Sequence, residues 1–283
     1  MRFPARRRYL LPGFFFCRFS MKLFDRVFYY PDRRKRTTPA EAGLAFEDVS
    51  LRAADGTALH AWLLPSRTAE SRGTVLHLHG NAANITGHWP FIGWLPAAGY
   101  HVLALDYRGY GRSEGTPTRE GTLLDAEAAL DYLRDRPEVD PRRIFIFGQS
   151  IGGAIASVLA ARRNGQLAGV IIDSAFTSYR EIARYHILRN PMMLLMAWWF
   201  PFGVNHSYDP IEQITAINPT PILIMHGKAD RIIPWQMSKR LYDTATGPKE
   251  LWLIEDMDHM EAWELIPEEA GSRFVAFCER ALA

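Results

Sequence analysis

The sequence predicts an α/β fold in which a mostly parallel β-sheet lies between layers of helices. Two observations indicate this class. From residue 46 onward, short apolar runs rich in β-branched and aromatic residues alternate with stretches of helical periodicity. The runs are continuously apolar, as expected of strands that helices cover on both faces. Such alternation of strands and helices is typical of a parallel sheet.

Length and composition are those of a globular enzyme. The chain has 283 residues, of which 48% are hydrophobic and 23% charged, so it can bury one large core. The formal net charge of +2 gives no reason to expect a nucleic-acid partner. Its two cysteines, Cys17 and Cys278, form no disulfide framework and no metal-ligand spacing. We therefore expect no metal.

The first two strands are predicted to form a hairpin, because 46–52 and 58–64 alternate in polarity and are joined through Asp55-Gly56. Six more strands are expected, at 74–79, 100–106, 143–148, 169–173, 221–226 and 250–255. Helices are expected at 122–136, 152–163, 235–246 and 267–282. No linker divides this part, so we predict one domain over 46–283, with eight strands in a mostly parallel sheet.

One connection is unusually long. More than forty residues separate the strand ending at Asp173 from the strand that begins at Pro221. They include the intensely apolar stretch 191–203, which is too short to cross a bilayer. We expect a small helical lid insertion at about 177–217. Its apolar side chains either line an acyl pocket or pack on the sheet, and the candidate substrate-binding residues are Met192, Leu195, Trp198 and Trp199.

Residues 1–36 form a basic and aromatic arm that we expect to lie outside the fold. They hold eleven Lys or Arg and two Asp or Glu, whereas the rest of the chain holds 22 and 29. Three interpretations stay open: an extension preceding a start at Met21, an export signal with paired arginines, or a segment for peripheral contact with an anionic membrane. We expect a cytoplasmic protein, with this arm as the candidate for membrane contact.

A nucleophile is indicated by the pattern G-x-S-x-G at 148–152. A predicted strand runs directly into it and a predicted helix leaves it. A turn between strand and helix at this point exposes the hydroxyl of Ser150, and the flanking glycines relieve its crowding. The backbone N–H of Ile151 then lies beside that hydroxyl, where it can stabilise an oxyanion.

A serine needs a base and an acid that orients the base. His259 follows the last predicted strand, and Asp230 follows the one before it, so the chain order is Ser150, Asp230, His259. Asp173 is the alternative acid. We expect His79 and His226 to be structural, and Asp256 and Asp258 to be solvated loop charges. The second oxyanion donor is expected from the loop after the third strand, at the N–H of Asn81.

These residues resemble the α/β-hydrolase superfamily. The loops at 106–113 and 230–234 are similar to those after its fourth strand and around its acid, and the His-Gly-Asn-Ala run at 79–82 is similar to small-lid serine hydrolases that include protein depalmitoylases. The resemblance implies hydrolysis of esters or thioesters without a cofactor. Two positions depart from it: Ala83 stands where that branch often has glycine, and the turn before His259 contains no glycine.

The predicted function is therefore cleavage of carboxylic esters or thioesters through an acyl-enzyme on Ser150. The expected substrate is a small-molecule or lipid-like acyl compound. Transfer of the acyl group to an alcohol or amine is the alternative, because it uses the same intermediate. A peptidase and a non-catalytic binding protein are further alternatives, since the fold alone does not decide between them.

Overall fold

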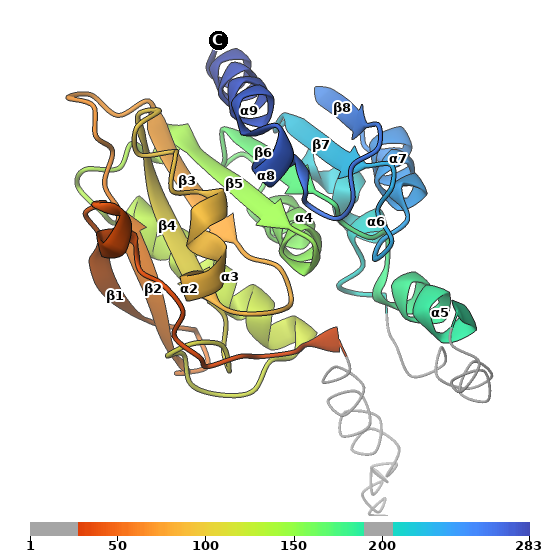
Figure 1. Ribbon diagram of the computed structural model, residues 1–283, viewed down its shortest axis with the longest axis horizontal. Helices are drawn as coiled ribbons and strands as arrows, with labels where there is room; N and C mark the ends of the chain where they lie inside the picture. The colour runs from red at the N-terminus through yellow and green to blue at the C-terminus, as the bar shows by residue number, and fades with distance from the viewer. Residues whose placement is uncertain (1–27, 190–205) are drawn as a thin grey trace, which may run out of the picture.

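A computed structural model describes residues 28–189 and 206–283. Its centre is an eight-stranded sheet in the order β1-β2-β4-β3-β5-β6-β7-β8 (Figure 1). The strands are β1 Glu47–Arg52, β2 Ala58–Leu64, β3 Gly73–Leu78, β4 Tyr100–Asp106, β5 Ile144–Gln149, β6 Gly169–Asp173, β7 Ile222–Gly227 and β8 Lys249–Ile254. Each predicted strand is present, with bounds within one residue of those expected, so the α/β-hydrolase fold is confirmed.

The strand pairing explains why the inner strands are continuously apolar whereas the edge strand β1 alternates in polarity. β1 pairs with β2, and β2 with β4, in antiparallel fashion, whereas all other pairs are parallel. Every residue of β3, β5, β6 and β7 is buried. The edge strand β1 alternates between exposed and buried residues over its last half. Because all strands from β3 to β8 run the same way, their carboxyl ends meet at one edge of the sheet.

Helices cover both faces of the sheet (Figure 1). One face packs against α3 Arg119–Arg134, α4 Ile151–Arg162, η7 Ile214–Ile217 and α7 Trp235–Thr244. The other face packs against α2 Ile85–His88, η3 Trp89–Phe91, α8 Ala262–Leu265 and α9 Pro267–Leu282. The remaining helical segments are η2 Pro39–Ala42, η4 Pro141–Arg143, α5 Tyr179–Arg189 and α6 Pro210–Gln213. Two separate apolar clusters, one on each face, make up the core.

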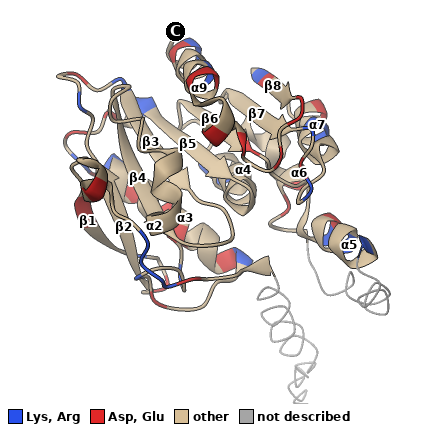
Figure 2. Ribbon diagram, in the orientation of Figure 1, with Lys and Arg blue, Asp and Glu red and all other residues tan. Residues whose placement is uncertain are grey.

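Charged residues are rare in the inner strands of the sheet. Figure 2 shows Lys, Arg, Asp and Glu mainly in helices and connecting segments, with the middle of the sheet almost free of them. Strands β2 to β7 contain no Lys or Arg, and their only acidic residues are Asp106 and Asp173, each at a carboxyl end. Within residues 28–189 and 206–283, none of the helices has both the length and the hydropathy required to cross a membrane.

The N-terminal boundary differs from the predicted one. Residues 28–36, which we assigned to an arm outside the fold, pack on the domain. Tyr29 is only 4% exposed and belongs to the larger core cluster. The Asp32 carbonyl accepts hydrogen bonds from Asn84 Nδ2 and from the Gly111 N–H, both at 2.9 Å. The charge of this segment obscured these contacts, because a basic run is usually a solvated face.

The predicted insertion at about 177–217 is described in part. α5 extends from the carboxyl end of β6, and Arg240 of α7 donates to Glu181 of α5 at 2.5 Å. α6 and η7 pack against α4, on the body of the domain. The candidate substrate-binding residues Met192, Leu195, Trp198 and Trp199 lie outside the described residues, and their assignment stays a prediction.

Candidate active site

Ser150 occupies a strained turn between β5 and α4. Its φ of 56° and ψ of −118° lie in a region that residues other than glycine rarely adopt. The turn is held by a hydrogen bond of 2.8 Å from the Ser150 N–H to the Asp173 carbonyl. A Cβ at position 148 would lie 2.4 Å from the Gly152 carbonyl oxygen, and one at position 152 only 2.0 Å from that of Leu78. Glycine is therefore required at both positions of the motif.

Two backbone N–H groups flank Ser150. The N–H of Ile151 begins α4, and that of Asn81 lies in the loop after β3. Neither donates a hydrogen bond to any acceptor among the described residues. The loop after β3 contacts the serine directly, because a Cβ built on Gly80 would lie 3.6 Å from Ser150 Cβ. Two unpaired donors beside a hydroxyl are what an oxyanion site requires.

Asp230 and His259 are joined by a short hydrogen bond. His259 Nδ1 lies 2.6 Å from Asp230 Oδ2. Asp230 Oδ1 accepts from the N–H groups of Ile232 and Ile233, both at 2.8 Å. Burial works to raise the pKa of the Asp230 carboxyl, but the hydrogen bonds from His226 and His259 outweigh it, so this pKa lies well below its ordinary value. Asp230 is therefore a carboxylate at neutral pH.

The structure does not join the base to the nucleophile. Among the described residues, Ser150 Oγ forms no hydrogen bond, with His259 or with any other group. Ser150 is 9% exposed, and the His259 side chain is 13% exposed. Such contacts often form only when substrate is bound.

His226 was expected to be structural, and it contacts the acid directly. Its Nε2 lies 2.9 Å from both Asp230 Oδ2 and the Ile233 carbonyl, so this nitrogen carries the proton. Its Nδ1 lies 2.7 Å from Ser238 Oγ. The position of His226 at the end of β7, four residues before Asp230, is the signal that sequence reasoning missed.

The loop that carries His259 contains no glycine, and Asp256 takes the place of one. Its φ is 55°, a left-handed conformation that Asp tolerates better than most residues. Asp258, expected to be a solvated charge, instead joins two loops. Its Oδ1 accepts from the N–H of Arg231 at 3.0 Å and from that of His259 at 2.8 Å. It thereby holds the loop of the base against the loop of the acid.

Asp173, the alternative acid, has other partners. Its Oδ2 accepts from Trp263 Nε1 at 2.7 Å and from Gln149 Nε2 at 3.3 Å, and its Oδ1 from Ser174 Oγ at 2.8 Å. It forms no hydrogen bond with His259. Gln149 precedes the serine and Trp263 lies in α8, just after His259. Asp173 therefore connects the nucleophile turn with the helix that follows the base.

The loop at 106–113 supports the loop after β3. Tyr107 Oη donates to the His79 carbonyl at 3.1 Å, and Tyr110 Oη donates to Asn81 Oδ1 at 2.9 Å. Arg108 holds the loop on α3 through several hydrogen bonds to Asp125, the shortest 2.8 Å long. The motif that the sequence singled out here thus supports the residues around Asn81, the candidate second oxyanion donor.

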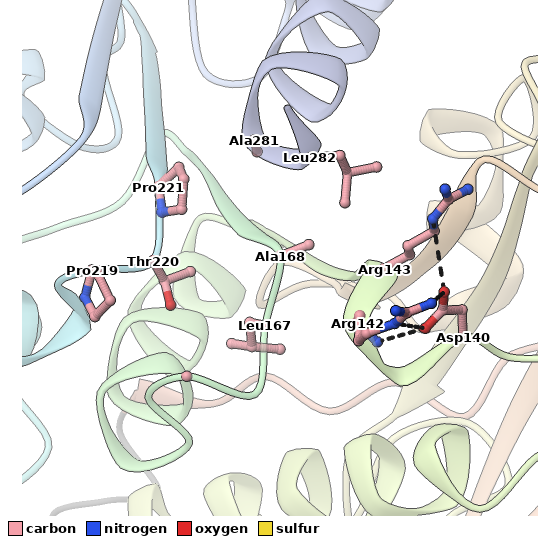
Figure 3. A pocket seen from close by; sticks show the side chains of 11 residues that line it. Asp140, Arg142, Arg143, Leu167, Ala168, Pro219, Thr220, Pro221, Ala281 and Leu282 are labelled. Carbon is pink, nitrogen blue, oxygen red and sulfur yellow. Dashed lines mark hydrogen bonds and ion pairs between the residues drawn. The ribbon is translucent and has the colours of Figure 1, made fainter.

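Other parts of the described chain offer less chemistry. A cavity of about 480 Å³ lies at the opposite edge of the sheet, lined by residues that precede β5, β6 and β7 and by the end of α9 (Figure 3). Its arginines Arg142 and Arg143 pair with Asp140. No group of three or more His, Cys, Asp or Glu in the described ranges is arranged to hold a metal ion.

Comparison with known proteins relates the chain to α/β-hydrolases. The family model described as "Serine aminopeptidase, S33" matches residues 69–208. The uncharacterized protein YfhR of Salmonella typhimurium is 41% identical over 251 residues, which cover 84% of this chain and 81% of that protein. The α/β hydrolase domain-containing protein WAV2 of Arabidopsis thaliana is 32% identical over 243 residues, which cover 80% of this chain and 76% of that protein.

Among solved structures, the Pyrococcus furiosus esterase Pf2001 has a similar fold. It superposes with a TM-score of 0.70 at 25% identity, covering 89% of this chain and 99% of the esterase. The similarity therefore extends over nearly the whole esterase and most of this chain.

Proposed function

Because this chain belongs to the α/β-hydrolases, as its relative WAV2 does, we propose that it cleaves carboxylic esters and thioesters through an acyl-enzyme on Ser150. One observation carries the proposal: the Asp230–His259 pair lies at the same sheet edge as a serine flanked by two unpaired N–H groups. The similarity to an esterase in fold supports ester chemistry. The resemblance to protein depalmitoylases extends the proposal to thioesters.

In the proposed mechanism, His259 Nε2 accepts the proton of Ser150 Oγ as the oxygen attacks the acyl carbonyl. Asp230 accepts the Nδ1–H of His259, which keeps the proton off Nε2 before the attack and stabilises the imidazolium afterwards. The N–H groups of Asn81 and Ile151 donate to the oxyanion of the tetrahedral intermediate. His259 then protonates the leaving alcohol or thiol, and a water molecule, activated by the same histidine, releases the acid.

The experiment is labelling with a fluorophosphonate probe, measured by intact mass on the wild type, Ser150→Ala and His259→Ala. We expect one adduct on the wild type, none on Ser150→Ala and strongly slowed labelling of His259→Ala. Absence of labelling on folded wild type would contradict the proposal. Circular dichroism of each variant controls for folding.

A matched set of substrates then separates the reaction classes. Acyl esters and thioesters of increasing chain length are compared with aminoacyl and peptidyl amides, because the family description names an aminopeptidase. We expect ester and thioester turnover to exceed amide turnover. Adding an alcohol as acceptor tests the alternative of acyl transfer, since a transferase would form the new ester faster than the free acid.

A further inference from the structure

The side chain of Asn81 is bound to the N-terminal segment of the fold. Asn81 Nδ2 donates to the Phe28 carbonyl at 2.8 Å, and the Tyr30 N–H donates to Asn81 Oδ1 at 2.9 Å. The two amide atoms are assigned without ambiguity, because a backbone N–H can only donate and a carbonyl can only accept. The amide therefore holds the backbone on both sides of Tyr29.

Tyr29 anchors this segment in the core. Its side chain is 4% exposed, and its hydroxyl lies 3.1 Å from Thr122 Oγ1 and 3.3 Å from Tyr179 Oη. The ring of Phe28 packs edge-on against Tyr179, with centroids 5.0 Å apart. Since Tyr179 begins α5, residues 28–30 extend from the loop after β3 to the helix after β6. Figure 1 shows this end of the chain and α5 at the same side of the molecule.

Ser150 lies between the loop after β3 and the helix after β6. It follows β5, the strand that pairs with β3 on one side and β6 on the other. The segment therefore crosses the sheet edge at the strands that carry the nucleophile and its oxyanion loop. Tyr110 Oη supplies a third hydrogen bond to the Asn81 amide, 2.9 Å long, and donates to the same oxygen as the Tyr30 N–H.

We infer that residues 28–30 are a positioning segment, which fixes the backbone of Asn81 so that its N–H points to the oxyanion. The inference rests on the proposed function, because it assigns the Asn81 N–H a role in that reaction. An oxyanion donor is effective only within about 2.7–3.1 Å of the developing charge. A side chain held by three hydrogen bonds restricts the rotation of its own backbone. Among the described residues, the Asn81 side chain forms no hydrogen bonds besides these three.

The test compares two substitutions at one position, Tyr30→Pro and Tyr30→Ala. Proline removes the N–H that donates to Asn81, whereas alanine keeps it, and the Tyr30 side chain is already 66% exposed. Both variants are made in the full chain and assayed with p-nitrophenyl butyrate. We expect kcat of Tyr30→Pro to be at least about 10-fold below that of Tyr30→Ala with KM within about threefold, since losing one oxyanion donor costs about 100- to 1,000-fold.

A second variant tests the inferred role of residues 28–30 if Tyr30→Pro is poorly folded. Tyr29→Phe removes the hydroxyl that holds the segment against Thr122 and Tyr179, and Tyr132→Phe is its control on α3, where the hydroxyl contacts Arg136. We expect kcat to fall in the first and not in the second. Equal kcat within each pair, with active wild type, would overturn the inference. A wild type that takes no fluorophosphonate label would instead contradict the proposed function.

Discussion

His226 donates through Nε2 to Oδ2 of Asp230 across 2.9 Å, at a point where both side chains are inaccessible to solvent. The same oxygen accepts from His259. Its other oxygen accepts from two backbone N–H groups, so four hydrogen bonds hold the Asp230 carboxylate. These hydrogen bonds fix the orientation of the carboxylate. The carboxylate in turn orients His259, the proposed base, through a hydrogen bond of 2.6 Å.

The first prediction concerns His226. We expect His226→Leu to lower kcat by about 10- to 100-fold with little change in KM, because a hydrogen bond to a buried charge contributes about 1.5–3 kcal/mol. His226→Gln should lose less, since the glutamine amide can donate from nearly the same place. Steady-state kinetics on a soluble ester, with thermal melts of each variant, checks this. Wild-type kcat in the leucine variant would show that His226 does not orient the acid.

The second prediction separates the two candidate acids. Asp230→Asn should lower kcat by about 10,000-fold, as removal of the orienting charge does in other serine triads. Asp173→Asn should retain most of kcat and instead lower the free energy of unfolding by about 1–3 kcal/mol, because an amide cannot accept from all three donors that Asp173 satisfies. The measurements are ester turnover and urea denaturation. The reverse ranking of the two kcat values would make Asp173 the acid.

Sequence reasoning succeeded where the pattern is local. The strands were predictable because burial on both faces makes each one a continuous apolar run, as in β5 and β7. The pair Asp230 and His259 was predictable because each follows the carboxyl end of a neighbouring parallel strand. The structure places those side chains 2.6 Å apart, and their catalytic roles remain our proposal.

The partners of Asn81 were not predictable in this way. Tyr30 and Tyr110 lie 51 and 29 residues from Asn81, on opposite sides of it in the sequence. No periodicity or motif relates positions that meet only after the sheet has formed. Asp258 was misjudged for the same reason: its charge suggested solvent, but its oxygen is occupied by the N–H of Arg231, 27 residues away.

A third prediction concerns the backbone of Ala83, in the loop after β3. Its φ is 66°, in the left-handed region that costs a residue with a Cβ about 1–2 kcal/mol. We expect Ala83→Gly to raise the free energy of unfolding by up to about 1 kcal/mol, because relief of strain exceeds the added entropy of the unfolded chain. Urea denaturation measures it. The control is Ala82→Gly, at a position without positive φ, which should destabilise; equal effects of both substitutions would contradict the account.

The last prediction is a loss of stability in mild acid, caused by three histidines around the loop after β3. Burial lowers the pKa of His77 to about 3, and burial also lowers the pKa values of His79 and His88 below their ordinary value. One ring nitrogen of each has no hydrogen-bond partner in the described part of the chain, so a proton there would be a buried charge without a hydrogen bond. Asp106 lies 3.7 Å from His79 Nε2 and offsets part of that cost.

Well above pH 6.5 these histidines are neutral in both the folded and the unfolded chain and contribute no pH dependence. Below about pH 6.5 the unfolded chain binds protons that the folded chain cannot, so the free energy of unfolding falls as the pH falls. The slope of the free energy of unfolding should be at most about 1.4 kcal/mol per pH unit for each histidine, and at most about 4 kcal/mol per pH unit for all three. Urea denaturation at pH 7.5, 6.5 and 5.5 measures it, and His88→Gln should reduce the slope by about one third. A free energy of unfolding that stays constant from pH 7.5 to 5.5 would mean that these rings accept protons in the folded state.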